Sequence, residues 1–158
     1  MLAIILLALL CASASGNAIQ SRSSYSGEYG GRGGKQFSHS ANQLNGSITA
    51  IRVRFNSFYI TGLQVRYGTV WSEYVGGQQG NMEEIFLHPG ESVIQVSGKY
   101  RIYMKQLIFV TNMGRKLTFG DDKGTCFTAV PLHPNTFLRF ISGRSGIFID
   151  AISLHWDV

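Results

Sequence analysis

Residues 87–109 read LHPGESVIQVSGKYRIYMKQLIF, and residues 132–154 read LHPNTFLRFISGRSGIFIDAISL. The same 45-residue interval separates Leu87 from Leu132 and Ser97 from Ser142, so the two stretches are copies of one unit. A fainter third copy, offset by about 44 residues, places residues 59–65 over residues 103–109. This periodicity predicts three related units within one chain.

One position differs in chemistry between the copies. In the alignment Thr61, Lys105 and Asp150 are equivalent, and we call this the rim position. Only the third copy offers a carboxylate there, whereas the Lys105 ammonium suits an anionic ligand. The repeat therefore predicts one carboxylate-based site rather than three.

Most of the chain alternates apolar and polar residues with a period of two. Ile51, Val53 and Phe55 share one face of a predicted strand, and Arg52 and Arg54 share the other. Turn sequences such as Asn-Gly and Pro-Gly separate the strands, and no amphipathic helix is predicted after residue 16. Short strands at short intervals predict an all-β sandwich, barrel or prism, and the threefold repeat favours the prism.

The first residues have the layout of a secretory signal peptide. An apolar run over residues 2–10 precedes the small residues 11–16, although the usual positive charge before the run is absent. We expect residues 1–16 to be removed, residues 17–24 to be a flexible N-terminal segment, and residues 25–158 to form one domain. No later segment is apolar enough to predict a transmembrane helix.

Removal of the signal peptide leaves Cys126 as the only cysteine of the mature chain. An intrachain disulfide is then impossible, and a small buried hydrophobic residue is the favoured interpretation of Cys126, with pairing between chains as the alternative. The net charge of +5 is consistent with a polyanionic partner.

The pattern of potential catalytic residues argues against an enzyme. The histidines at positions 39, 88, 133 and 155 are scattered, without metal-ligand spacing, so no metal or cofactor is expected. Glu83 and Glu84 are adjacent on a predicted strand and should point to opposite faces, which prevents them from acting as a carboxylate pair.

Two loops have a composition suited to ligand binding. Asp150 follows the tight loop Ser142 to Gly146, where a carboxylate can accept hydrogen bonds from neighbouring hydroxyls while loop N–H groups donate. The alternative is that Asp150 caps local backbone groups. The segment Gly30 to Lys35 has little side-chain bulk, so its backbone can approach a ligand; its alternative is a flexible linker.

The chain resembles the jacalin-related lectins in four features taken together. These are the loop Gly30 to Gly34, the GxxxD segment Gly146 to Asp150, the final Ser153-Leu154-His155-Trp156 strand and the threefold β pattern. The resemblance covers essentially the whole chain. It implies a β-prism of three four-stranded Greek-key sheets with pseudo-threefold symmetry, carrying one mannose-type sugar site at one end.

The resemblance also implies which residues bind the sugar. Family members use a glycine loop, a recognition loop and a binding loop, which fall here on residues 30–34, 99–103 and 145–150. Asp150 would accept hydrogen bonds, backbone N–H groups would donate, and Phe148 would either stack on an apolar sugar face or cover the core. The implied sugar-binding residues are Gly34, Arg101, Gly146, Ile147, Phe148 and Asp150.

A basic surface for sulfated glycosaminoglycans is implied by the same relatives. The matching positions are Lys35, Arg52, Arg54, Arg101 and Lys105, with Arg32 as an addition. Gln36 and Gln78 stand where basic residues are expected, which predicts a weaker patch; the alternative is a solvated strand face without a ligand. Two functions follow as hypotheses: a secreted mannose-type lectin, or a cargo-organising protein that acts through proteoglycans.

The expected locations are the secretory granule lumen, the Golgi lumen and the extracellular matrix or mucus. Bacterial peptidoglycan is a further ligand that the resemblance implies, whereas nucleic acid is not expected. Asn45-Gly46-Ser47 fits both an N-glycosylation acceptor and a hairpin turn.

Overall fold

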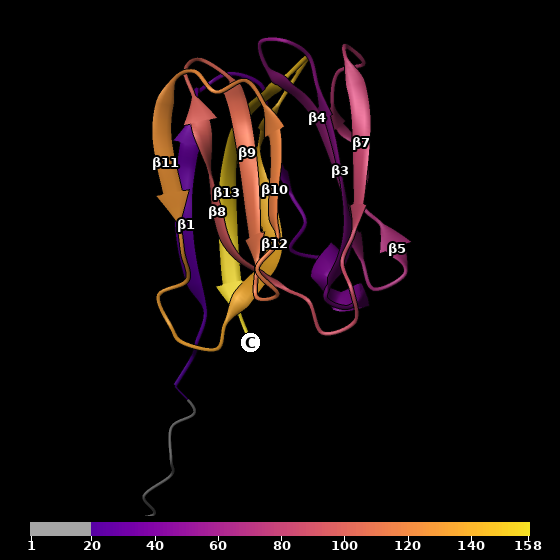
Figure 1. Ribbon diagram of the computed structural model, residues 1–158, viewed down its shortest axis with the longest axis vertical. Coiled ribbons are helices and arrows are strands. Elements are labelled where there is room, and N and C mark those ends of the chain that lie inside the picture. Colours follow the sequence, from indigo (N-terminus) through magenta and orange to yellow (C-terminus); the bar gives the residue numbers. More distant parts are fainter. Residues whose placement is uncertain (1–19) are drawn as a thin grey trace, which may run out of the picture.

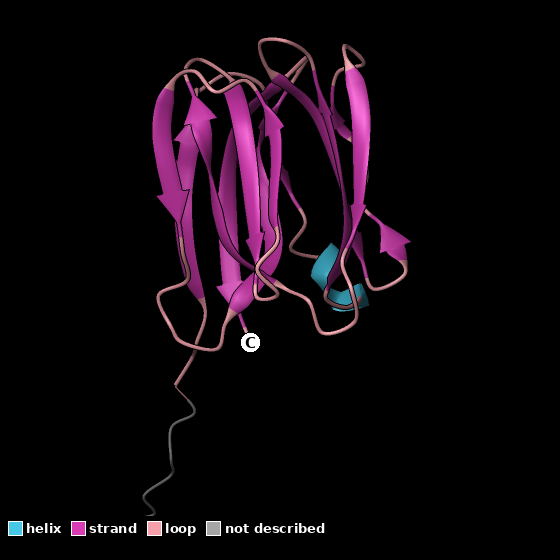
Figure 2. Cartoon of the chain, in the orientation of Figure 1, coloured by secondary structure: helices cyan, strands magenta, loops and turns pink. Residues whose placement is uncertain are grey.

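The computed structural model describes residues 20–158, which fold into three antiparallel β-sheets (Figures 1 and 2). The predicted signal peptide at residues 1–16 lies outside this range, as do residues 17–19 of the segment predicted to be flexible. Residues 20–23 have no regular secondary structure, and the first strand begins at Ser24.

Each sheet is built around a central hairpin. The first sheet has the order β1 (Ser24–Gly30), β13 (Ile149–Asp157), β12 (Phe137–Ser145), β2 (Lys35–Ser38). The second has the order β10 (Lys116–Gly120), β9 (Met104–Thr111), β8 (Val93–Tyr100), β11 (Thr125–Ala129). The third has the order β5 (Val70–Trp71), β4 (Ile60–Tyr67), β3 (Ile48–Phe55), β7 (Asn81–Phe86), with β6 (Val75–Gly76) also paired to β4.

The sheets share the Greek-key order that the family resemblance implied, with one difference. The third sheet has five strands instead of four because its outer edge is divided into β5 and β6. Between them, Ser72 bonds back to β4, since its N–H donates to the Val65 carbonyl at 2.7 Å and its hydroxyl accepts from the Val65 N–H at 3.0 Å. The prediction of a β-prism is confirmed.

The two ends of the chain complete one sheet together. Strand β1, indigo in Figure 1, pairs with β13, yellow in the same view, and β2 pairs with β12. The loop between β1 and β2 therefore lies beside the turn between β12 and β13. These two segments, far apart in the sequence, are the glycine loop and the loop that carries Asp150.

The core lies where the inner faces of the three sheets meet. Strands β4, β9 and β13 contact one another pairwise, and their inward side chains are fully buried. In β4 these include Leu63, Val65 and Tyr67, as the alternation predicted. Because the rim residue is the second residue of each of these strands, the core fixes the positions of all three rim residues.

The structure corrects the interpretation of Cys126. Its side chain is exposed on β11, an edge strand of the second sheet. Strand alternation turns Phe127 and Ala129 into the core and leaves Cys126 outside. Pairing between chains stays a prediction.

The Asn45-Gly46 sequence does not form a hairpin turn. Asn45 ends the short 3₁₀ helix η1 (Asn42–Asn45), shown in cyan in Figure 2, and Gly46 follows it with a φ of 131°. The strands on either side, β2 and β3, belong to different sheets. Asn45 is exposed.

Within residues 20–158 no helix is both long and apolar enough to cross a membrane. The same part of the chain contains no group of three or more His, Cys, Asp or Glu side chains that could hold a metal ion.

A buried polar pair links the first and third sheets. His39 is 4% exposed, and its Nδ1 lies 2.8 Å from the Tyr67 hydroxyl, whereas its Nε2 has no partner in the described structure. Burial lowers the pKa of His39 from 6.5 to about 4. A neutral imidazole is thus part of the folded state.

This pair predicts acid sensitivity. Between pH 6.5 and pH 4 the unfolded chain binds a proton at His39 that the folded chain does not, so the free energy of unfolding should fall by up to about 3 kcal/mol as the pH decreases. Urea unfolding at several pH values measures this slope. His39→Gln should flatten it, and exposed His88→Gln should not; equal slopes in all three proteins would contradict the prediction.

Candidate functional site

The same backbone contact occurs three times at one end of the prism. In each unit the carbonyl of the rim residue accepts a hydrogen bond from a loop that joins two outer strands. The contacts are Gly31 to Asp150 at 2.9 Å, Asp121 to Lys105 at 2.8 Å, and Gly77 to Thr61 at 2.8 Å. The predicted equivalence of the three rim residues is therefore present in the backbone.

Glycines make this contact possible. The three loops span Gly30 to Gly34, Gly76 to Gly80 and Gly120 to Gly124, and the glycine at each end has a positive φ. A Cβ on Gly30, Gly76 or Gly120 would collide with the carbonyl of the adjacent rim residue. The sequence interpretation recognised only the first of these loops, although the 44-residue spacing of the other two GxxxG segments was a usable signal.

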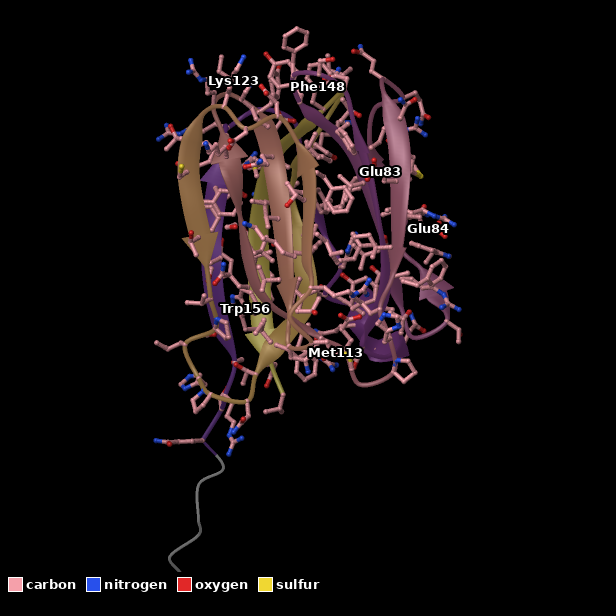
Figure 3. The ribbon with its side chains drawn as sticks, viewed as in Figure 1. Glu83, Glu84, Met113, Lys123, Phe148 and Trp156 are labelled. Carbon is pink, nitrogen blue, oxygen red and sulfur yellow. The ribbon has the colours of Figure 1, made fainter. Side chains whose placement is uncertain are left out.

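Three aromatic rings form a cluster at this end of the prism. Tyr59, Tyr103 and Phe148 occupy equivalent positions, and their ring centroids are 4.8 to 5.3 Å apart. Phe148 stacks on Tyr59 with an interplanar angle of 28° and meets Tyr103 edge-on. The half-buried ring of Phe148, labelled in Figure 3, thus packs within this aromatic cluster, and its stacking on a sugar stays a prediction.

The glycine loop and the Asp150 carboxylate border the same space. A Cβ on Gly33 would lie 2.7 Å from Oδ1 of Asp150, and one on Gly34 would collide with Oδ2. A Cβ on Gly146 would lie 3.9 Å from both Oδ2 of Asp150 and Cα of Gly34. The structure brings together Gly34, Gly146 and Asp150 from the opposite ends of the sequence.

Asp150 is 4% exposed, and its carboxylate is poorly compensated. Burial raises the pKa of the Asp150 carboxyl above its ordinary value, while the Arg144 guanidinium and the Asp150 N–H lower it less. The Arg144 side chain is itself paired with Glu28 at 3.0 Å. The carboxylate oxygens thus remain available as acceptors.

Unused donors surround this acceptor. Within residues 20–158 the backbone N–H groups of Gly34, Ile147 and Phe148 donate to no protein acceptor. The turn itself is held by Gly146, whose N–H donates to the Phe148 carbonyl at 2.9 Å. The site therefore offers a buried carboxylate and several free N–H groups from two rigid loops.

The loop that carries Arg101 borders the glycine loop. A Cβ on Gly31 would collide with the carbonyl of Ile102, so the two backbones are in direct contact. Arg101 is exposed at this border, and its N–H donates to the Tyr103 carbonyl at 3.0 Å. The backbone that carries Arg101 therefore lies beside the glycine loop, and a contact of its side chain with a sugar stays a prediction.

The other two rim positions are filled by their own side chains. Thr61 Oγ1 donates to the Gln79 carbonyl at 2.5 Å. Lys105 Nζ donates to the Phe58 carbonyl at 2.9 Å and lies 3.5 Å from the Asp121 carboxylate. Among these three side chains in the described structure, only that of Asp150 forms neither a hydrogen bond nor an ion pair with another residue.

Arg52 and Arg54 share a face of β3, as predicted, but both side chains are engaged. Arg52 is paired with Glu84 and lies 3.7 Å from the centroid of the Trp71 ring. Arg54 donates to the Tyr74 hydroxyl at 3.2 Å and to a backbone carbonyl at 3.0 Å. Glu84 and Glu83 point to opposite faces of β7, as predicted and as Figure 3 shows.

Other exposed cations lie on or next to the outer loops and the Arg101 turn, with Lys35 as the first residue of β2. Arg32, Lys35, Arg101 and Lys123 are exposed, and in the part of the chain that the structure describes none of them forms an ion pair. The sequence interpretation did not include Lys123 in the basic surface, although the loop of Lys123 is the counterpart of the glycine loop in the second copy. Figure 3 places Lys123 and Phe148 at the same end of the molecule.

Comparison with known proteins agrees with this geometry. A family model described as a jacalin-like lectin domain matches residues 26–155. Zymogen granule membrane protein 16 of Rattus norvegicus is 79% identical over 158 residues, which cover 99% of this chain and 95% of the relative.

Solved structures match as well. A prostate-specific WGA16 glycoprotein lectin has a TM-score of 0.73 and 34% identity, covering 84% of this chain and 97% of that chain. A complex of artocarpin with Me-alpha-mannose has a TM-score of 0.72 at 24% identity, covering 88% of this chain and 100% of that chain, and supports the fold. The chain therefore belongs to the jacalin-like lectin domain family, whose members bind carbohydrates and are not enzymes.

Proposed function

We propose that the protein binds mannose-type glycans through Asp150 and the two loops beside it, without a metal ion. One observation supports this proposal most directly: a carboxylate without a side-chain partner lies on loops whose N–H groups, at Gly34, Ile147 and Phe148, donate to no protein acceptor. Adjacent sugar hydroxyls each donate and accept, so they need this mixture of partners. The carboxylate acceptor makes these hydrogen bonds charge-assisted.

The choice of mannose rests on relatives. Artocarpin, which has the same fold, is described in complex with Me-alpha-mannose. In the present chain Phe148 packs against Tyr59 and Tyr103, so the sugar is held by polar contacts, and Arg101 borders it from outside.

A second proposed ligand is a sulfated glycosaminoglycan, held by the exposed loop cations. Arg32, Lys35 and Arg101 carry this binding together with Lys123, because their charges are not paired. Arg52, Arg54 and Lys105, the other residues of the predicted patch, contribute less since each already contacts a protein partner. We also propose bacterial peptidoglycan as a ligand of this protein.

The name of the rat relative indicates the granule membrane of zymogen-secreting cells. We propose the lumen of secretory granules and the Golgi as the location of the protein, and the extracellular matrix or mucus after secretion; the relative's name supports the granule part of this proposal. A cargo-organising role within granules is compatible with the glycosaminoglycan-binding surface.

Replacement of Asp150 tests the sugar site. Asp150→Asn should weaken binding to a mannoside by about 10- to 100-fold, because charge-assisted hydrogen bonds are lost. The melting temperature should stay the same or rise, since burial disfavours the ionised carboxylate in the folded state. Glycan-array binding and calorimetry measure the two effects, with Asp157→Asn as the control. A fall in stability with unchanged binding would mean that Asp150 is a structural cap.

Replacement of Gly34 tests the close approach of the glycine loop. Gly34 has a φ of 73°, and Gly114 has a φ of 79° with open space around its Cβ position. Alanine should cost about 1–2 kcal/mol of stability at Gly114, and more at Gly34, where its Cβ would also lie 2.8 Å from the Ser145 backbone. Only Gly34→Ala should also abolish mannoside binding, because its methyl group would collide with Asp150. Equal mannoside affinity of the two variants in titration calorimetry would contradict the assignment.

Salt distinguishes the two proposed ligands. Heparin affinity should fall steeply with ionic strength, whereas mannoside affinity should barely change. Replacing both Arg32 and Lys35 by Gln should reduce the slope of log affinity against log salt by roughly two, by analogy with phosphate contacts. The matched control replaces Arg52 and Arg54 by Gln. A larger loss in the control would place the binding surface on the strand face.

A further inference from the structure

Three apolar side chains protrude from this end of the prism. Phe58, Ile102 and Ile147 occupy equivalent positions in the three units, immediately before the rings of Tyr59, Tyr103 and Phe148, and are 63%, 72% and 66% exposed. We call them the apolar tips. Isolated exposed apolar residues are common on protein surfaces, but three equivalent ones around a symmetry axis form a single surface.

The apolar tips are held by rigid turns. The N–H of Arg101 donates to the Tyr103 carbonyl at 3.0 Å, and the N–H of Gly146 donates to the Phe148 carbonyl at 2.9 Å. In the first unit the N–H of Asn56 donates to the Tyr59 carbonyl at 3.1 Å. Each turn is thus closed onto the aromatic cluster, so the tips are fixed before any partner binds.

Positive charge accompanies the apolar tips. The four exposed cations Arg32, Lys35, Arg101 and Lys123 belong to the same end of the prism. The acidic residues of these loops are already paired, Asp122 with Lys99 at 2.7 Å and Asp121 with Lys105 at 3.5 Å. The surface therefore combines protruding apolar groups with unbalanced positive charge.

We propose that this end of the prism docks on an anionic lipid bilayer, with Phe58, Ile102 and Ile147 entering the headgroup boundary and the four cations contacting lipid headgroups. Charge complementarity selects this partner, because an anionic lipid surface attracts clustered Lys and Arg side chains. The geometry agrees: the apolar tips project from turns and do not line a groove, so a deformable, flat apolar phase covers them better than a protein side chain would.

Binding to vesicles tests the proposal independently of the sugar site, because the vesicles contain no sugar. The protein should sediment with phosphatidylcholine vesicles that contain phosphatidylserine, and not with phosphatidylcholine alone. Phe58→Ser and Ile102→Ser should each weaken this binding on the order of tenfold. The control is Leu132→Ser. Leu132 is 78% exposed and lies in the loop after β11, whereas the loop with Lys123 precedes β11, so the two loops are at opposite ends of that strand.

A fluorescent reporter locates the contact. Phe58→Trp should shift its emission to the blue on phosphatidylserine vesicles and be quenched by brominated acyl chains, whereas Leu132→Trp should show neither effect. Heparin affinity of Phe58→Ser and Ile102→Ser should be unchanged, which separates insertion from charge binding.

Three results would overturn the proposal. The first is no sedimentation with vesicles of either composition; the second is full binding by Phe58→Ser and Ile102→Ser. The third is self-association in sedimentation velocity that Ile102→Ser abolishes, because the apolar tips would then be an interface between copies of this chain. Melting temperatures of all variants establish that each is folded.

Discussion

The backbone hydrogen bond between each outer loop and its rim residue is the constraint on which this structure depends. It recurs as Gly31 to Asp150, Gly77 to Thr61 and Asp121 to Lys105, at 2.8 to 2.9 Å. Glycines at the ends of these loops permit the approach, since a Cβ on the first of each would strike the accepting carbonyl. The contact joins the outer strands of every sheet to its central strand and so fixes which loops lie together at one end.

Function then depends on side chains mounted on an unchanged backbone. Lys105 and Thr61 bond to nearby carbonyls, and these contacts stabilise the fold but leave no group for a ligand. At the third position short loop residues lie around Asp150, and its carboxylate has no side-chain hydrogen-bond donor. Burial without a partner destabilises an ionised group. The ionised Asp150 carboxylate therefore lowers the stability of the folded protein, and its oxygens stay free to accept hydrogen bonds from a ligand.

The termini make that site possible. Strands β1 and β2 complete the sheet of β12 and β13, which brings Gly34 next to Asp150 across more than a hundred residues of sequence. The apolar tips lie at one end because the turns that follow the central strands β3, β8 and β12 are all there. The outer loops with Arg32 and Lys123 lie at the same end because their backbones donate to the rim residues Asp150 and Lys105. Sugar, anionic and apolar contacts thus share one surface.

The sequence alone determined the β-prism and the equivalence of Thr61, Lys105 and Asp150, because repeats and alternation are local patterns that the backbone must obey. Charge was harder to assign: alternation placed Arg52 and Arg54 on one face, but only the tertiary structure showed Glu84, Trp71 and Tyr74 engaging them. Cys126 was misassigned, since strand composition does not reveal which face of an edge strand meets the core. The tertiary structure also decided that Phe148 packs on Tyr59 and Tyr103, and that the loop N–H groups of Gly34, Ile147 and Phe148 donate to no protein acceptor. Such properties depend on partners distant in sequence, which no local pattern encodes.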